Sequence, residues 1–181
     1  MTSAAAAGTL ITEDYRRMQQ ELHRNPNYGV ASVAYAGLVA DVIRAQNARE
    51  LLDYGAGKGR LGETLRQHNI PIAVRHYDPA IPEWSARPEP CQLVACIDVL
   101  EHIEPDCLAN VLDDLKRVTA GFGVFTVHTG PAVKVLADGR NAHLIQKPSA
   151  WWLPQFMARF ELVAFNRVEN GFWIVVEAHK H

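Results

Sequence analysis

The segment from Leu51 to Arg60, LLDYGAGKGR, constrains the fold of this chain more than any other. Its apolar beginning is typical of a strand that is buried on both faces. Glycines at alternate positions, Gly55, Gly57 and Gly59, allow a sharp turn and let a ligand approach the backbone with no Cβ in the way. Apolar residues then recur at helical spacing from Leu61. The segment therefore predicts a strand, a glycine-rich turn and a helix, which together build a nucleotide-type cofactor site.

The glycine spacing excludes two common nucleotide motifs. Gly-x-Gly-x-Gly differs from the Gly-x-Gly-x-x-Gly of dinucleotide folds, and a P-loop is excluded because Lys58 follows Gly57 too early and precedes Gly59 rather than Ser or Thr. A second apolar strand, Ile72 to Tyr77, ends on Asp78, 19 residues after Gly59. An acidic residue at this place can accept hydrogen bonds from both hydroxyls of a ribose. We therefore expect a cofactor that carries a ribose.

With Asp53 in the first motif, the two segments resemble motif I and the acidic loop of class I S-adenosylmethionine-dependent methyltransferases. The resemblance extends over roughly Ala48 to the C-terminus. It implies an α/β, Rossmann-like fold with a mostly parallel, seven-stranded-type sheet and a C-terminal antiparallel hairpin. It also implies S-adenosylmethionine as the cofactor and methyl transfer as the reaction. The residues expected to hold the cofactor are Asp53, Gly55, Gly57, Gly59, Asp78 and Asp98.

Composition and charge set limits on the size and partners of the protein. The chain has 181 residues, of which 48% are hydrophobic and 21% charged, as expected of one globular domain with a substantial core. With a net charge of −2, the chain lacks the excess positive charge typical of non-specific nucleic-acid binding, so a small-molecule acceptor is favoured. Three cysteines without metal-finger spacing indicate reduced thiols and a cytoplasmic location. The alanine-rich start has neither a basic leader nor a long apolar stretch, so we expect no membrane anchor.

The chain divides into three predicted parts. Residues 1–11 are expected to be a disordered tail, and residues 12–47 a helical N-terminal lid, which the resemblance implies can close over the site. In the lid, Thr12 is expected to cap one helix that ends near His23, and a second helix to run from Ser32 to Gln46. Residues 48–181 are expected to form the methyltransferase core.

Within the core, the proline-rich residues 79–90 cannot form a regular helix, so the third strand of the family's order and its helix are expected to be shortened or missing. Ser149 is expected to cap a helix that ends at Phe160. The remaining predicted elements are a strand at Gln92–Ile97, a helix at Pro105–Thr119, a strand at Val124–Val127, and a hairpin of Glu161–Val168 with Phe172–Ala178.

Several polar side chains follow predicted strands, and the carboxyl ends of parallel strands share one edge of the sheet. Methyl transfer is an in-line displacement, so the main task is to hold the acceptor about 3–3.5 Å from the methyl carbon. A base helps where the acceptor carries a proton, and His128 and His143 can supply one near neutral pH, with His102 as a further catalytic candidate. The sequence thus favours a methyltransferase acting on a small-molecule or glycan-like acceptor.

The run from Asp98 to His102, DVLEH, leaves alternatives open. It resembles the post-strand motif of ubiquinone-pathway and sugar methyltransferases, which need no metal. It also looks like the Glu-x-x-Glu-His motif of small-RNA terminal 2′-O-methyltransferases, in which acidic and histidine ligands hold a divalent metal; here the ligands would be Asp98, Glu101, His102 and His143. Because Asp replaces Glu and basic character is low, we expect no metal. A metal-assisted RNA ribose 2′-O-methyltransferase and a non-catalytic S-adenosylmethionine-binding module stay as alternatives.

Overall fold

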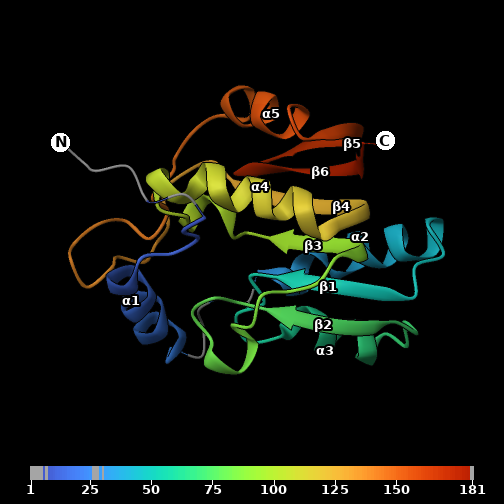
Figure 1. Ribbon diagram of the computed structural model, residues 1–181, viewed down its shortest axis with the longest axis horizontal. Coiled ribbons are helices and arrows are strands. Elements are labelled where there is room, and N and C mark those ends of the chain that lie inside the picture. The colour runs from blue at the N-terminus through green and yellow to red at the C-terminus, as the bar shows by residue number, and fades with distance from the viewer. Residues whose placement is uncertain (1–5, 7, 26–28, 30, 180–181) are drawn as a thin grey trace.

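The computed structural model describes residues 6, 8–25, 29 and 31–179 (Figure 1). Its helices are α1 (Glu13–His23), α2 (Ser32–Ala45), α3 (Arg60–Gln67), α4 (Leu108–Val118) and α5 (Ser149–Met157). Its strands are β1 (Glu50–Tyr54), β2 (Ala73–Tyr77), β3 (Cys91–Ile97), β4 (Thr119–His128), β5 (Phe160–Val168) and β6 (Gly171–Ala178). Short 3₁₀ turns lie at Pro82–Trp84, Leu100–His102 and Pro105–Cys107.

These strands form one six-stranded sheet in the order β2-β1-β3-β4-β6-β5. The pairs β1–β2, β1–β3 and β3–β4 are parallel, whereas β6 is antiparallel to both β4 and β5. This confirms the predicted mostly parallel sheet with a C-terminal antiparallel hairpin. Residues 79–90 hold only the turn at Pro82–Trp84, so the predicted loss of the third strand is also confirmed. Prolines there lack the N–H that a sheet ladder requires, and β2 is left as one edge of the sheet.

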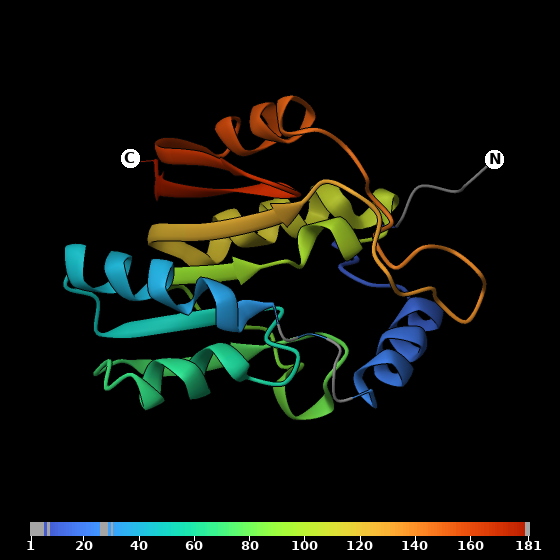
Figure 2. The ribbon, with the colours of Figure 1, turned by 180° about the vertical axis from the view of Figure 1, so that it is seen from behind.

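Helices cover both faces of the sheet. α4 and α5 pack on one face, where Leu112 and Trp152 are fully buried against β4 and β6 (Figure 1). α2 and α3 pack on the other, where Val39 and Leu61 lie in a cluster with β1 and β3 (Figure 2). The central strands are therefore buried on both sides, which explains why most of their residues are apolar. No helix within the described ranges has the length and apolar character needed to cross a membrane.

Several element boundaries differ from those predicted; α4, for example, begins at Leu108, because Pro105–Cys107 form a 3₁₀ turn. Thr119 adopts an extended conformation and begins β4, so this strand is longer than the predicted Val124–Val127. The last helix ends at Met157, earlier than expected. Ser149 is not its cap: Pro148, with φ −67° and ψ 160°, occupies the N-cap position and Ser149 is the first helical residue. The fixed φ of proline suits this entry into the helix, and the serine hydroxyl makes no capping bond.

α1 lies apart from the helix layers, beyond the carboxyl ends of β1, β2 and β3 (Figure 1). The predicted cap is confirmed, because Thr12 Oγ1 accepts a hydrogen bond from the Tyr15 N–H at 3.3 Å. Tyr15 Oη donates to the His102 carbonyl at 2.5 Å, and Gln20 Nε2 donates to the Ala80 carbonyl at 3.1 Å. α1 is thus bonded across the edge of the sheet at two places, whereas α2 belongs to a helix layer.

The described residues just before α1 contact the core. Leu10 packs against the cluster beneath α4, and Asn110 Nδ2 donates to the Thr9 carbonyl at 2.9 Å. Positions 1–5 and 7 of the predicted tail lie outside the described residues, as does Tyr28, near the break between the two predicted lid helices. The predicted division into tail, lid and core stays a prediction.

Candidate active site

A cavity of about 470 Å³ opens at the carboxyl ends of the parallel strands, beneath α1. Residues 55–57 and 78–80 form one side, which we call the glycine half. His102, His128, His143 and the loop residues 131–134 form the other, which we call the histidine half. Tyr15, Gln19 and His23 of α1 complete the wall. The cavity therefore brings together groups that are far apart in the sequence, such as Tyr15 and His143, which are separated by 128 positions.

The glycine turn has the backbone conformation that its sequence predicts. Gly55, Gly57 and Gly59 have φ values of 78°, 53° and 66°, in the left-handed region that glycine enters without a steric cost. The Gly55 N–H donates to the Tyr77 carbonyl at 2.7 Å, which ties the turn to the end of β2. A Cβ at Gly55 would lie 2.4 Å from Val99 Cγ2. Glycine is therefore required here by both conformation and space.

Asp78 is fixed at the wall of the cavity by the backbone around it. Its side chain is buried, with an exposed fraction of 7% for the residue. Asp78 Oδ2 accepts the Gly57 N–H at 2.9 Å, and Oδ1 accepts the Ala80 N–H at 2.9 Å. Because each carboxylate oxygen has two lone pairs, each can accept one further hydrogen bond from a ligand in the cavity. This geometry suits the two hydroxyls of a ribose.

Asp53 lies at the base of the glycine turn and also lines the cavity. Its Oδ2 is 3.3 Å from His76 Nδ1, and the His76 ring packs against Trp84 at a centroid distance of 4.6 Å. Burial raises the pKa of the Asp53 carboxyl, and the hydrogen bond from His76 opposes that shift. A Cβ at Gly59 would lie 3.1 Å from the Trp84 ring, so Gly59 shapes the start of α3 rather than the cavity wall. Sequence reasoning missed His76 and Trp84.

Asp98 has an uncommon backbone conformation for a residue with a side chain. Its φ is 52°, and such left-handed residues often occur at functional sites. Thr126 Oγ1 donates to Asp98 Oδ1 at 2.6 Å and accepts the Asp98 N–H at 2.8 Å. The carboxylate therefore lines the cavity from a fixed position. Sequence reasoning missed Thr126, although an isolated hydroxyl in an apolar strand was a usable signal.

The structure brings the three predicted histidines together. The His143 ring lies between the other two, 4.7 Å from His102 and 4.7 Å from His128 by ring centroids. His102 Nδ1 is 2.8 Å from the Ala142 carbonyl, and His143 Nδ1 is 2.8 Å from the Gly130 carbonyl. A carbonyl only accepts hydrogen bonds, so these partners assign the proton of each neutral ring to Nδ1. Nε2 is then the basic nitrogen of both His102 and His143.

Burial keeps two of these imidazoles neutral at pH 7. It lowers the pKa of His102 to about 4, with a further contribution from the neighbouring His143, and it also lowers the pKa of His143. His128 differs, because its Nδ1 lies 3.1 Å from the Gly130 N–H nitrogen and 3.2 Å from the Gly130 carbonyl oxygen, so these contacts fit either tautomer of the ring. The histidine half thus offers two basic nitrogens, Nε2 of His102 and Nε2 of His143.

Glu101 is the most unusual group next to these rings. It is fully buried; its Oε1 accepts the His128 N–H at 2.9 Å, whereas its Oε2 has no hydrogen-bond partner among the described residues. Burial raises the pKa of this carboxyl well above its ordinary value, and Asp98 raises it further. A buried, unpaired carboxyl oxygen is costly unless the group is protonated or meets a cation.

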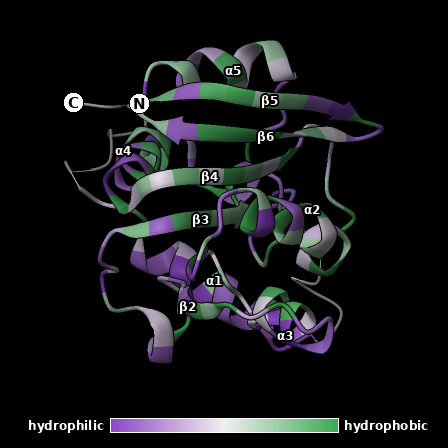
Figure 3. Ribbon diagram, turned by 90° about the vertical axis from the view of Figure 1, so that its right-hand side faces the viewer, coloured by the Kyte–Doolittle hydropathy of each residue, from purple (hydrophilic) through white to green (hydrophobic). Residues whose placement is uncertain are grey.

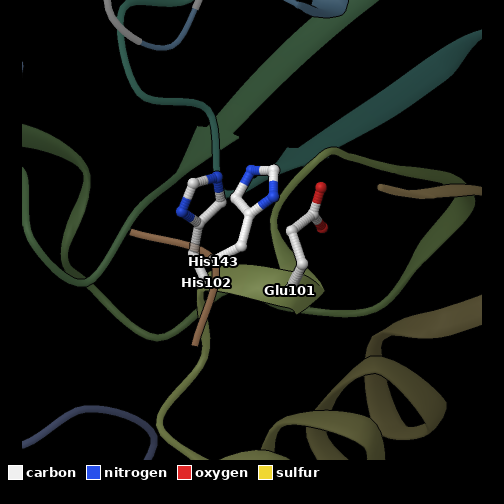
Figure 4. Close-up of side chains that lie close together, drawn as sticks. All are labelled: Glu101, His102 and His143. Carbon is white, nitrogen blue, oxygen red and sulfur yellow. The ribbon is translucent and has the colours of Figure 1, made fainter. Parts of the chain in front are cut away.

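Glu101, His102 and His143 form a group that fits a divalent metal ion. One potential ligand atom from each lies within 4.8 Å of the others (Figure 4). One carboxylate and two imidazoles suit a first-row ion, and the carbonyls on the two Nδ1 atoms are the outer partners that metal-binding histidines commonly have. Asp98, the fourth ligand in the metal alternative, is not in this group, and its Oδ1 accepts a hydrogen bond from Thr126. The candidate metal set therefore has three residues.

No protein-family model and no curated protein matches this chain by sequence. Solved structures do match. The 1,6-didemethyltoxoflavin-N1-methyltransferase of Burkholderia thailandensis, with bound 1,6-didemethyltoxoflavin and S-adenosylhomocysteine, is 16% identical with a TM-score of 0.63, over 98% of this chain and 95% of that one.

Two further structures are similar. The magnesium protoporphyrin IX methyltransferase ChlM of Synechocystis PCC 6803, with bound S-adenosylmethionine, is 15% identical with a TM-score of 0.63, over 98% of this chain and 100% of that one. The methyltransferase domain of bacterial CtHen1-C is 14% identical with a TM-score of 0.59, over 80% and 97%. Identities this low establish the fold alone, and that fold is the one of the class I S-adenosylmethionine-dependent methyltransferases.

Proposed function

We propose that this chain is an S-adenosylmethionine-dependent methyltransferase that acts on a small-molecule or glycan-like acceptor. The observation that carries the proposal is the hydrogen bond from the Gly57 N–H to Asp78, in a cavity that continues to three histidines. The Gly57 backbone and the Asp78 carboxylate, which suit a nucleoside-containing cofactor, therefore lie in the same cavity as imidazoles that can accept a proton. The bound S-adenosylhomocysteine and S-adenosylmethionine of two structural neighbours support this choice of cofactor.

The glycine half fits such a cofactor. Its backbone is open to a ligand only because Gly57 lacks a side chain: a Cβ there would lie 3.0 Å from the His23 ring, and φ is already left-handed. Asp78 would bind the ribose hydroxyls through its two remaining acceptor positions, while Asp53 and Asp98 line the same cavity. When bound, S-adenosylmethionine would supply a methyl group on a positively charged sulfur.

The chain itself would position the acceptor, exclude water and remove a proton. α1 crosses the mouth of the cavity and is held there by Tyr15 and Gln20, as a lid over both substrates would be. Nε2 of His102 or His143 would accept the proton of an acceptor O–H or N–H, because both rings are neutral and basic at that atom at pH 7. His128 lines the same cavity and would help to orient the acceptor by contact with its ring.

A metal-assisted RNA ribose 2′-O-methyltransferase is the second candidate. It is favoured by the buried Oε2 of Glu101, which has no hydrogen-bond partner in the described part of the chain and lies next to two imidazoles. Glu101, His102 and His143 would hold the ion, which would act as a Lewis acid on the acceptor hydroxyl. The net charge of −2 favours the first candidate, because an RNA substrate usually meets a basic surface.

A turnover assay separates these functions. Purified protein is incubated with S-adenosylmethionine and either a fractionated metabolite mixture or small RNA, and S-adenosylhomocysteine is measured with either a chelator or added Mn²⁺. The first candidate predicts acceptor-dependent product that the chelator does not abolish. Product from RNA that requires Mn²⁺ would establish the second candidate. Tight cofactor binding without turnover on any fraction would instead indicate a non-catalytic binding module.

A further inference from the structure

β5 is the outer strand at one edge of the sheet and pairs only with β6 among the described strands. An edge strand presents a row of unpaired N–H and C=O groups to which another strand can bind. Along β5, the exposed fractions of Leu162, Val163 and Phe165 are 45%, 50% and 37%. Figure 3 shows the strand as hydrophobic in its middle and hydrophilic toward its two ends. This edge therefore combines free backbone groups with exposed apolar side chains.

The opposite edge of the sheet is protected. β2 has five residues, and Arg75 on it donates hydrogen bonds to the carbonyls of Glu89 and Pro90, at 3.4 and 2.9 Å. β5 has nine residues and contains no proline or lysine, the residues that commonly guard an edge. It carries a bulge between Leu162 and Ala164.

The sequence of β5 is complementary to itself in antiparallel pairing. Ala164 is the middle residue of Phe160–Val168, so a twofold axis at Ala164 pairs the whole strand with its copy. In that register Glu161 of one copy lies opposite Arg167 of the second copy, twice per dimer. Opposite charges across antiparallel strands are stabilising. The Glu161 side chain is 76% exposed despite a 3.5 Å contact with His179, so its carboxylate is accessible.

We propose that two copies of this chain associate through β5 and form a continuous sheet across a twofold axis at Ala164. Such an isologous interface buries Leu162, Val163 and Phe165 of both copies. It leaves the cavity open, because β5 lies beyond β6, at the far end of the sheet from the glycine half. The partner is a second copy because opposite charges face each other when the strand pairs antiparallel with its own copy.

Sedimentation of the full chain over a range of concentrations tests this proposal. The wild-type protein is expected to sediment as a dimer of twice 20.1 kDa. Glu161→Lys and Arg167→Glu should each raise the dimer dissociation constant about tenfold, because each places like charges opposite each other twice. The double variant restores both pairs with their signs exchanged and should recover the wild-type constant. Arg66→Glu, an equal charge change on exposed α3, is the matched control.

A third variant tests the strand independently of charge. Val163→Lys places a cation in the middle of the proposed interface and should yield a monomer, with circular dichroism showing that the fold is intact. A wild-type monomer at every concentration would overturn the proposal and show that the bulge alone protects the edge. A dimer that neither charge variant weakens, or that the double variant does not restore, would overturn this interface and register.

Discussion

The two halves of the cavity differ in the groups that line them: mainly backbone in the glycine half and side chains in the histidine half. The glycine half consists of backbone: a left-handed turn held to β2 by main-chain hydrogen bonds and closed by one carboxylate, Asp78, that itself binds N–H groups. The histidine half consists of side chains, with His102, His128 and His143 arriving from three separate segments around a buried Glu101. Because of this difference, cofactor affinity should depend on the space around the backbone of the glycine turn, and turnover on the protonation and position of side chains. Substitutions in the two halves should therefore separate binding from rate.

The largest expected effect lies in the histidine half. His143→Gln and His102→Gln should each be tested, and at least one should lower kcat by about 10²–10⁴-fold, because a positioned base would be lost. The dissociation constant for S-adenosylhomocysteine should stay within about threefold of wild type, since neither ring belongs to the glycine half. Single-turnover kinetics and calorimetry measure the two quantities. His68→Gln, on an exposed residue after α3, is the control.

If both substitutions leave turnover unchanged, positioning alone drives transfer and the assignment of a base is wrong. If both instead remove a dependence on added divalent ion, the metal-assisted function replaces the first proposal.

A smaller effect is expected at Asp78. Asp78→Ala should weaken S-adenosylhomocysteine binding by about 10–100-fold, because two charge-assisted hydrogen bonds to the ribose are lost. It should also lower the melting temperature, since the N–H groups of Gly57 and Ala80 lose their acceptor. Calorimetry and thermal unfolding measure both effects, with the exposed Asp106→Ala as control. A loss of affinity below threefold would show that the carboxylate does not contact the ribose.

The smallest effect concerns stability and pH. Burial raises the pKa of the Glu101 carboxyl in the folded chain. The stability that the protonated carboxyl contributes is therefore present below its pKa in the unfolded chain, about 4.3, and is lost as the pH rises toward its pKa in the folded chain. In the presence of a chelator, Glu101→Gln should therefore melt a few degrees higher than wild type at pH 8, by about 2–6 °C, and the difference should shrink toward pH 4. The exposed Glu83→Gln should show neither change.

Wild type and Glu101→Gln also test whether Glu101, His102 and His143 bind a metal ion. Added Mn²⁺ or Zn²⁺ should raise the melting temperature of wild type and not of Glu101→Gln if the group binds an ion. A Gln variant less stable than wild type at pH 8 in chelator would contradict the raised pKa of Glu101.

The two halves also differ in how far the sequence predicted them. The turn at Gly55–Gly59 and the carboxylate at Asp78 are local patterns, and local conformation alone required them, so both were found where expected. The clustering of His102 with His143 across 41 positions depends on the path of a loop, which no periodicity describes. Thr126 and His76 were missed because their roles are side-chain hydrogen bonds between strands. The start of α5 moved by one residue, from a cap at Ser149 to a cap at Pro148, because proline geometry outweighed the capping preference of serine.

Calorimetric titration of the wild-type chain and of Gly57→Val, each with S-adenosylhomocysteine and with NAD, tests whether the glycine half binds the proposed cofactor. Valine at Gly57 would have to adopt a φ of 53° and would contact the His23 ring. Its side chain should therefore fill the space through which the cofactor approaches the protein backbone. Gly37→Val, at a helical glycine with open space around its Cβ position, is the matched control. The account predicts that wild type and Gly37→Val bind S-adenosylhomocysteine and not NAD, and that folded Gly57→Val binds it at least 100-fold more weakly, about 2.7 kcal/mol. Unchanged affinity in folded Gly57→Val, or a preference for NAD, would contradict it.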